Sequence, residues 1–454
     1  MVKLPTRARG FTIVELLIVV VVIAILAAIA IVAYNGVTKR ATESTMKTDL
    51  KSISKRLEVD KTMSSTGYPA SLSAANEGKG LTTGTKSTLR YGLSGNGYCV
   101  SIRSQTYADL IFRIESSDGI LQNGDCTPGV AFVAGSLEDL GTTDGPGSSA
   151  LFNEPRGIVS DSSGNLFVAD YWNHRIRKIT PSHVVSTIAG SSQGFFDSPT
   201  GTSAQFNYPR GLAIDSSNNL YVADGGNNRI RKITPAGAVS TIAGSGTAGF
   251  LDHTTGASAQ FNAPRGVAVD ASGNVYVADS SNHRIRRITP AGAVSTVAGS
   301  STWGYHDNTG ALAQLRSPES IAVDASGNIY LSDYQNRCIR LITPAGVVTT
   351  IAGTNVSGYV DSPTGSVARF NSPWAIAISS AGDLYIADYG NNRIRKVTPA
   401  GAVTTVAGTG AAGATDGPAM SATFQDISGM AFTPSGSLYI TDRWNGVVRK
   451  IEFL

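Results

Sequence analysis

The sequence predicts a chain of two parts: an N-terminal long α-helix that leads into a small α+β body, and a C-terminal all-β six-bladed β-propeller. An apolar run over residues 11–33 predicts the helix. The 50 glycines and 15% charged residues favour turn-rich β structure in the remainder. An aspartate that recurs every 54 or 55 residues predicts the blades, at Asp170, Asp224, Asp279, Asp333, Asp388 and Asp442.

Residues 1–10 form a short basic leader, and the apolar run that follows contains only two polar residues, Thr12 and Glu15. A helix over residues 11–33 would rise about 35 Å, which is enough to cross the core of a bilayer. The basic flank predicts that the leader stays cytoplasmic and that the rest of the chain is exported. A carboxylate inside a membrane is costly, so Glu15 predicts a dedicated partner.

The junction of Gly10 and Phe11, with Glu15 five residues into the new chain, resembles the N-terminal segment of type IV prepilins over residues 1 to about 60. The resemblance implies cleavage between Gly10 and Phe11 by a prepilin peptidase and N-methylation of Phe11. It also implies single-pass insertion in the inner membrane, followed by assembly with other pilin subunits through Glu15. An ordinary anchor or a secretory signal peptide, cut near Ala28-Ile29-Ala30, is the alternative.

Residues 34–129 are expected to form a small pilin body. Leu50, Ile53 and Leu57 follow a helical period, so the helix is predicted to continue beyond the apolar run. A Gly/Ser/Thr-rich stretch, 71–88, ends it, and short strands are expected at 98–103 and 109–115. The resemblance to pilins implies a disulfide between Cys99 and Cys126, with two unpaired thiols as the alternative.

Residues 130–454 repeat a unit of four short strands, which is the pattern of a propeller blade. In one unit these strands are expected at 211–215, 220–224, 229–234 and 239–244. The last unit stops after its third strand, whereas an unmatched fourth strand, 130–135, stands at the start. The N-terminal strand is therefore predicted to complete blade six and to close the ring, which removes the open edge.

The segment Arg229–Ile233 and the recurring Ala-Asp pair resemble NHL-repeat propellers, including the kind found in teneurin-like proteins. The repeat is about ten residues longer than is usual for such propellers, and the extra residues fall in the fourth-to-first connection, as in 245–265. This long loop and the second-to-third turn should emerge on the same face. Long loops on a rigid scaffold are where binding is expected.

Recurring residues are interpreted as structural. Asp224 and Arg229 are expected to form one of a set of ion pairs, and Cys338 replaces that arginine in one blade. A loop apolar residue is predicted to fill the space between blades rather than to touch a ligand, at Phe152, Phe206, Phe261, Leu315, Phe370 and Phe424. A loop aspartate is predicted to cap its turn rather than to bind a metal such as calcium, at Asp144, Asp197, Asp252, Asp307, Asp361 and Asp416.

Residues that differ between the blades are the better candidates for binding. In the exposed turns these are Tyr171, Trp172, His174, Tyr208, His283, His306, Tyr334, Trp374, Tyr389 and Trp444. Aromatic side chains on one face suit the recognition of glycans, peptides or apolar surfaces.

Charge and motif content narrow the function classes. Residues 130–454 carry 22 Lys+Arg and 23 Asp+Glu, a net charge of −1, which argues against a nucleic-acid surface. No spacing typical of a nucleophilic triad, paired catalytic carboxylates or a zinc site is present, so neither a cofactor nor a metal is expected. The main hypothesis is a non-enzymatic minor or tip pilin on the pilus or cell surface, whose propeller binds a surface glycan or protein. The alternatives are a membrane-anchored exported enzyme with a lyase-type propeller, and a structural module of the pilus.

Overall fold

The computed structural model describes residues 38–39, 41–57, 87–94, 97–104, 111–115, 121–123 and 129–452. Apart from the last residue, the chain divides into two compact units, Met1–Cys126 and Thr127–Phe453. The leader, the predicted membrane segment at 11–33, and the residues Gly10, Phe11, Glu15 and Cys126 lie outside the described residues. The expected disulfide of Cys99 therefore stays a prediction.

The first unit contains a helix over residues 41–57 and a four-stranded antiparallel sheet. The helix buries Met46, Leu50, Ile53 and Leu57, which recur every three or four residues and so share one face. Within the described part of the chain, no helix has the length and apolar content that a membrane crossing requires. The strands follow the order β1 (Ser87–Ser94), β2 (Gly97–Ser104), β3 (Ile111–Glu115) and β4 (Leu121–Asn123).

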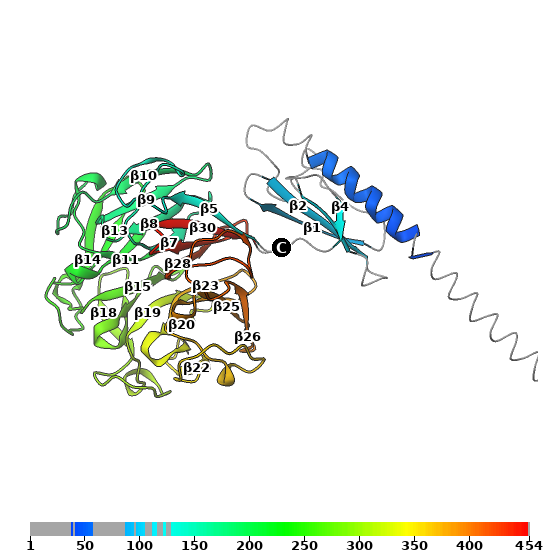
Figure 1. Ribbon diagram of the computed structural model, residues 1–454. Coiled ribbons are helices and arrows are strands. Elements are labelled where there is room, and N and C mark those ends of the chain that lie inside the picture. The colour runs from blue at the N-terminus through cyan, green and yellow to red at the C-terminus, as the bar shows by residue number, and fades with distance from the viewer. Residues whose placement is uncertain are drawn as a thin grey trace, which may run out of the picture. The chain divides into compact units, whose positions relative to one another are not determined.

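The second unit is the predicted six-bladed β-propeller, in which six sheets are arranged in a ring (Figure 1). The first strands of all six sheets line a central cavity. Blades one and two consist of β7 (Pro155–Ser160), β8 (Leu166–Asp170), β9 (Arg175–Ile179), β10 (Val184–Ala189), β11 (Pro209–Ile214), β12 (Leu220–Asp224), β13 (Arg229–Ile233) and β14 (Val239–Ala243). Blades three and four consist of β15 (Pro264–Val269), β16 (Val275–Asp279), β17 (Arg284–Ile288), β18 (Val294–Ala298), β19 (Pro318–Val323), β20 (Ile329–Asp333), β21 (Cys338–Ile342) and β22 (Val348–Ala352).

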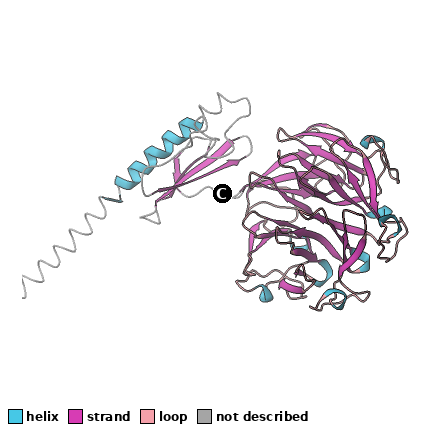
Figure 2. Ribbon diagram, turned by 180° about the vertical axis from the view of Figure 1, so that it is seen from behind, coloured by secondary structure: helices cyan, strands magenta, loops and turns pink. Residues whose placement is uncertain are grey.

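Blades five and six consist of β23 (Pro373–Ile378), β24 (Leu384–Asp388), β25 (Arg393–Val397), β26 (Val403–Ala407), β28 (Ile427–Phe432), β29 (Leu438–Asp442), β30 (Val447–Glu452) and β5 (Gly129–Gly135). Two-residue strands, β6 (Gly145–Pro146) and β27 (Gly417–Pro418), extend blades one and six. Figure 2 shows short helical turns between the strands: η1 (Gly201–Ser203), η2 (Gly225–Asn227), η3 (Gly256–Ser258), η4 (Ser280–Asn282), η5 (Gly310–Leu312), η6 (Tyr334–Asn336), η7 (Gly365–Val367) and η8 (Tyr389–Asn391).

The ring closes as the sequence predicts. The N-terminal strand β5 pairs antiparallel with the C-terminal strand β30, with Val130 opposite Ile451 and Gly135 opposite Val447. The first strands of successive blades contact one another around the ring, and β28 meets β7. They approach so closely that a Cβ on Gly211 would lie 2.3 Å from the backbone oxygen of Arg265. The first strands are therefore packed tightly against one another, which fixes the positions of the side chains at their ends.

The core is divided among the spaces between blades. Phe261 is fully buried in a cluster with Ala213 and Tyr221 of blade two and Val267 and Val275 of blade three. The loop phenylalanines thus fill the spaces between blades, as the sequence predicts, and each long loop is anchored by its own apolar side chain.

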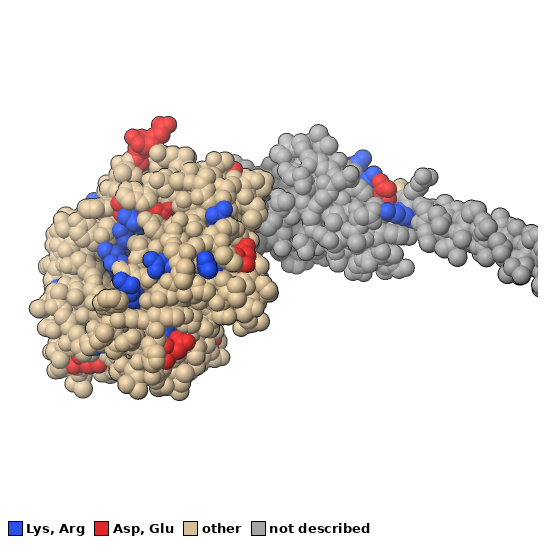
Figure 3. All heavy atoms as spheres, turned by 60° about the horizontal axis from the view of Figure 1, so that its bottom comes forward, with Lys and Arg blue, Asp and Glu red and all other residues tan. Residues whose placement is uncertain are grey.

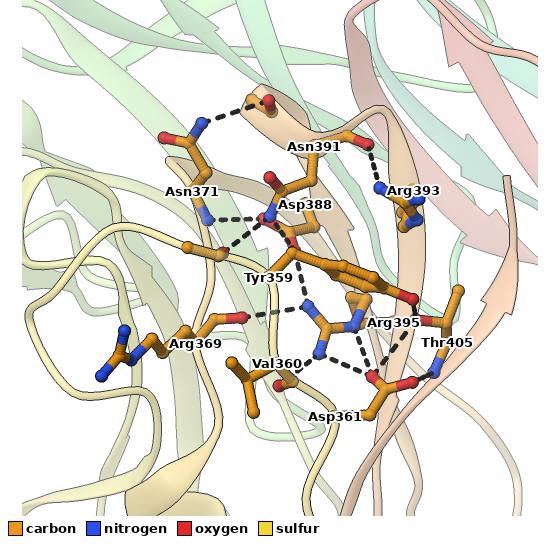
Figure 4. Close-up of polar contacts among 12 residues, drawn as sticks. Tyr359, Val360, Asp361, Arg369, Asn371, Asp388, Asn391, Arg393, Arg395 and Thr405 are labelled. Carbon is orange, nitrogen blue, oxygen red and sulfur yellow. Dashed lines mark hydrogen bonds and ion pairs between the residues drawn. The ribbon is translucent and has the colours of Figure 1, made fainter. Parts of the chain in front are cut away.

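A buried arginine connects each long loop to its sheet, and Figure 4 shows the copy in blade five. The Arg395 guanidinium lies 2.7 Å from a carboxylate oxygen of Asp388 and 2.6 Å from one of Asp361. It also donates hydrogen bonds to the backbone oxygens of Arg369 and Val360. Protein groups therefore supply its hydrogen-bond and ion-pair partners, and its side chain is 0% exposed.

The ion pair uses a different arginine from the one expected. Asp224 pairs with Arg231 at 2.7 Å, whereas Arg229 donates to the backbone oxygen of Ser245. Arg229 lies opposite Asp224 in the hairpin, but only Arg231 reaches both Asp224 and the loop residue Asp197. Cys338 stands at the position equivalent to Arg229, so blade four keeps its own ion pair between Asp333 and Arg340.

The loop aspartates also differ from expectation. The predicted role for Asp197 is a cap on its own turn. Its carboxylate instead accepts a hydrogen bond from the backbone N–H of Thr241 in β14 and pairs with Arg231 of β13. The reason is that the long loop folds back over the outer strands, which carry stronger donors than the turn itself.

Candidate binding site at the mouth of the central channel

The long loops and the second-to-third turns lie on the same face, which we call the long-loop face. In blade two, the N–H of Gly226 in the turn after β12 donates to the backbone oxygen of Asn207, at the end of the loop that precedes β11. Trp172 and Asn153 make the equivalent bond in blade one. The turn and the loop therefore hold each other in place beside the start of the first strand.

Six side chains surround the opening of the channel on this face, and we call them the channel mouth. Each belongs to the second residue of a first strand, and together they are Arg156, Arg210, Arg265, Glu319, Trp374 and Ser428. They line a cavity of about 400 Å³, whose deeper wall includes Ile158, Leu212, Val267, Ile321, Ile376 and Met430. Three adjacent blades contribute arginine, so the mouth is chemically asymmetric although the scaffold is repetitive.

The arginines of the mouth are only partly compensated. Arg156 is 7% exposed and lies 3.4 Å from a carboxylate oxygen of Glu154. Its guanidinium stacks 3.7 Å from the centre of the Tyr171 ring, and its Nε has no hydrogen-bond partner. Burial, together with the charges of Arg210 and Arg443, lowers the pKa of Arg156 to about 10. Arg265 forms an ion pair with Glu319. Among the described residues Arg210 has no carboxylate within ion-pair distance, and it donates to the Tyr171 hydroxyl at 3.3 Å.

A second charged group borders the mouth between blades six and one. Arg443 lies 2.8 Å from Glu154 and 2.7 Å from Asp426. Burial raises the pKa of Asp426 to about 6 although Arg443 opposes this. Burial also acts to raise the pKa of Glu154, but the hydrogen bond and charge of Arg443 outweigh it, so this pKa is lowered. Four arginines thus face three carboxylates, Glu154, Glu319 and Asp426, and Arg210 is the unpaired cation.

Most of the aromatic residues expected on this face gather in two clusters. In the first, the rings of Tyr171 and Tyr208 stack at 4.9 Å, with Trp172 and His174 against Tyr208. In the second, Trp374 lies between two tyrosines, 5.4 Å from Tyr334 and 5.3 Å from Tyr389. Because Trp374 also belongs to the channel mouth, the second cluster forms an aromatic wall across from the arginines.

Three of the expected residues lie outside these clusters: His283, His306 and Trp444. His306 is exposed on a long loop, and Trp444 is 54% exposed beside Arg443. His174 and His283 join neighbouring blades: their Nδ1 atoms accept hydrogen bonds from the N–H groups of Tyr208 and Ser317. Asn228 of blade two makes the equivalent contact to blade three, because its side-chain oxygen accepts a hydrogen bond from the N–H of Ala263.

Sequence reasoning missed the arginines of the mouth and a second set of aromatics on the long loops. The Arg229 guanidinium lies 3.7 Å from the centre of the Phe195 ring, and Phe250 and Tyr359 are stacked in the same way. An aromatic residue two positions before a loop aspartate was the available signal for these. For the mouth, the signal was the change from arginine to glutamate, tryptophan and serine at one repeat position.

Charged side chains are unevenly distributed over the described surface of the propeller. In the view of Figure 3, Lys and Arg side chains lie across the middle of the propeller surface and Asp and Glu side chains mainly toward its margin. Within residues 38–57 and 129–452, so far as they are described, no group of three or more His, Cys, Asp or Glu side chains is arranged to hold a metal ion. The loop aspartates are engaged by arginines instead.

Two families match parts of the chain. The family described as NHL repeat matches residues 152–179, 206–233, 261–288 and 370–397, each running from a loop phenylalanine to the end of a third strand. The prokaryotic N-terminal methylation motif matches residues 5–31, which include Gly10, Phe11 and Glu15.

Curated relatives share the propeller. The protein SUPPRESSOR OF QUENCHING 1, chloroplastic, of Arabidopsis thaliana is 29% identical over 58% of this chain and 26% of its own length. Teneurin-4 of Mus musculus is 26% identical over 53% of this chain and 10% of its own length. NHL repeat-containing protein 2 of Homo sapiens is 28% identical over 56% of this chain and 40% of its own length. The chain thus spans well under half the length of each of these relatives.

Solved structures share the fold. An auxiliary nutrient binding protein from Bacteroides thetaiotaomicron superposes with a TM-score of 0.57 at 17% identity, over 78% of this chain and 83% of that one. Its counterpart from Bacteroides ovatus gives 0.56 at 17% identity over the same shares. The chain therefore carries a prokaryotic N-terminal methylation motif ahead of an NHL-repeat six-bladed β-propeller that is similar to a segment of the teneurins.

Proposed function

We propose that this chain is an exported, pilin-like protein that displays its propeller on the cell surface, where the long-loop face binds a surface glycan or protein. The observation that carries the proposal is the methylation motif at 5–31, which spans the Gly10-Phe11 junction of a chain whose larger part is a propeller. A prepilin peptidase would cleave at that junction, and residues 34–129 would serve as the pilin body. A head of this size on every subunit would crowd a filament, so a minor or tip position is favoured.

The binding role rests on how the propeller uses its repeat. Positions that recur, such as Asp224, Arg231 and Phe261, are buried and build the scaffold. Positions that differ between blades surround the channel mouth and the turns beside it. A rigid frame with one chemically distinct face supports recognition by that face.

The experiment compares adherence of cells that carry the full chain or its variants. Trp172 and Trp444 are 45% and 54% exposed beside the mouth, so the double variant Trp172→Ala, Trp444→Ala should reduce adherence strongly without unfolding the protein. Val184, 43% exposed at the start of β10 at the other end of its blade, supplies the control, and Val184→Ala should leave adherence unchanged. Full adherence by the double tryptophan variant would show that another face binds.

A further inference from the structure

We infer that the arginine side of the channel mouth binds a carboxylate, and that the ligand it selects is an acidic saccharide. This inference rests on the proposed function, because it names the ligand class of the long-loop face.

The channel mouth has a positive charge that no described group of the protein balances. Arg156, Arg210 and Arg265 come from three adjacent blades and line one cavity. Arg210, which is partly buried, has no carboxylate partner among the described residues. Arg156 lies 3.4 Å from Glu154, but its buried Nε has no hydrogen-bond partner. A partly buried guanidinium without a counter-ion is costly, so the presence of Arg210 at an open cavity favours an anion that arrives from outside.

The charge balance of the mouth selects the charge of that anion. The mouth and its border hold four arginines and three carboxylates, so one positive charge remains. Glu154 pairs with both Arg443 and Arg156. Asp426 pairs with Arg443, and Glu319 with Arg265, so Arg210 is the arginine without a carboxylate among the described residues. One excess charge matches a monoanion better than a phosphate dianion. The planar arginine fork also matches the two oxygens of a carboxylate.

The wall opposite the arginines suits a sugar ring. Trp374, between Tyr334 and Tyr389, forms the wall opposite the arginines, and the Arg156 guanidinium lies 5.7 Å from the centre of its ring. The C–H face of a sugar ring packs on such a wall, and its hydroxyls can bond to Ser428 and Glu319, which also line the cavity. The cavity of about 400 Å³ is within the range of small-ligand sites.

The test uses the full-length protein in detergent on an array of glycans that end in a uronic or sialic acid, each paired with its carboxyl-reduced neutral form. At least one acidic glycan should bind, and its neutral partner should bind about tenfold more weakly or not at all. Equal binding of the two forms, or binding of neither for every pair, would overturn the inference. A peptide that ends in a free carboxylate and inorganic phosphate serve as further probes, and tighter binding of either would show that the ligand class is wrong.

Two arginines of blade two provide matched variants for affinity measurements by calorimetry. Arg210→Met should weaken binding of the acidic glycan about tenfold, whereas Arg229→Met, which removes an arginine outside the cavity, should leave the affinity unchanged. Unchanged affinity in Arg210→Met sinks the carboxylate subsite. If that variant still supports adherence that depends on Trp172 and Trp444, the proposed function survives while the ligand class fails.

Discussion

Six buried arginines hold the long loops to their sheets. Arg231 places its charged fork between the carboxylates of Asp197 and Asp224 and donates to the backbone oxygens of Gln205 and Phe196. Burial raises the pKa of Asp224 to about 6, against the pull of Asn227 and Arg231. Neither charge is stable in the interior alone, so each loop and its sheet depend on one another.

Replacement of one such arginine should be severe. Arg231→Met leaves the carboxylate of Asp224 buried without its counter-charge, and the free energy of unfolding should fall by about 3–5 kcal/mol. Urea denaturation followed by circular dichroism measures the loss. The neighbouring Lys232→Met is the control and should change stability by less than about 1 kcal/mol, because Lys232 is only half-buried. Similar losses in both variants would contradict the role of the buried pair.

The inter-blade histidines predict a pH dependence of stability. Burial lowers the pKa of His174, and burial with the charges of Arg284 and Arg316 lowers that of His283. Between the unfolded value of about 6.5 and the lower folded value, the unfolded chain takes up protons that the folded chain refuses. The free energy of unfolding therefore falls as the pH falls through this window. Protonation of a folded histidine also removes the Nδ1 acceptor of its inter-blade hydrogen bond.

The chain itself supplies the control for this effect, since Asn228 makes the same inter-blade contact without titrating. The double variant His174→Asn, His283→Asn should lose less stability between pH 7 and pH 5 than the unchanged protein, because asparagine does not titrate. The melting temperature of both proteins across that range is the measurement. Parallel pH profiles would mean that these histidines do not couple protonation to folding.

At the scale of elements, the ring depends on the pairing of β5 with β30. Without β5, the backbone groups of β30 would form an open edge, and Val133, which is 2% exposed among residues of blades one and six, would leave a gap. The first and last strands of the propeller therefore hold the ring closed together.

Truncation tests this closure. A fragment of residues 127–454 keeps β5 and should be monomeric and cooperatively folded. A fragment of residues 136–454 lacks it and should aggregate or unfold at lower temperature. Light scattering after size-exclusion chromatography distinguishes the two. An equally stable monomer from the shorter fragment would show that the β5–β30 contact does not close the ring.

The repeat made the elements predictable, because six copies of one strand pattern average out local ambiguity. The loop phenylalanines were predictable for the same reason, since an apolar residue at one position in every blade must be buried. In the first unit, β2 and β3 fall where strands are expected, but β1 (Ser87–Ser94) was missed because it starts inside the Gly/Ser/Thr-rich stretch. No repeat was available there to correct the local signal.

The site was less predictable than the scaffold. Arg229 and Arg231 stand two residues apart on the same strand, and spacing alone does not tell which one reaches both Asp197 and Asp224. Arg156 follows a proline in a strand pattern and resembles a routine repeat residue. Its importance depends on where the first strands converge around the channel, which a linear sequence does not display. Trp374 was the one member of the channel mouth that its aromatic character brought to notice.

In the whole molecule, an N-terminal segment that resembles that of prepilins precedes a propeller with one chemically distinct face. The first would place the protein in a filament, and the second would bind a ligand.

Assembly should then depend on Glu15, which would meet the N-terminus of a neighbouring subunit. Glu15→Ala should leave processing intact but remove the protein from the sheared filament fraction, as judged by immunoblotting. Thr12→Ala, in the same apolar run, is the control and should assemble normally. Normal assembly of Glu15→Ala would contradict this role.

The most direct test of the account is mass spectrometry of the N-terminal peptide of the protein in the sheared filament fraction. A protein that is mounted as a pilin should begin at Phe11 with a methylated amino group, so trypsin should release a methylated peptide that ends at Lys39. Absence of the protein from that fraction, or a mature chain that begins at any other residue, would contradict the claim that the propeller is displayed by pilin processing.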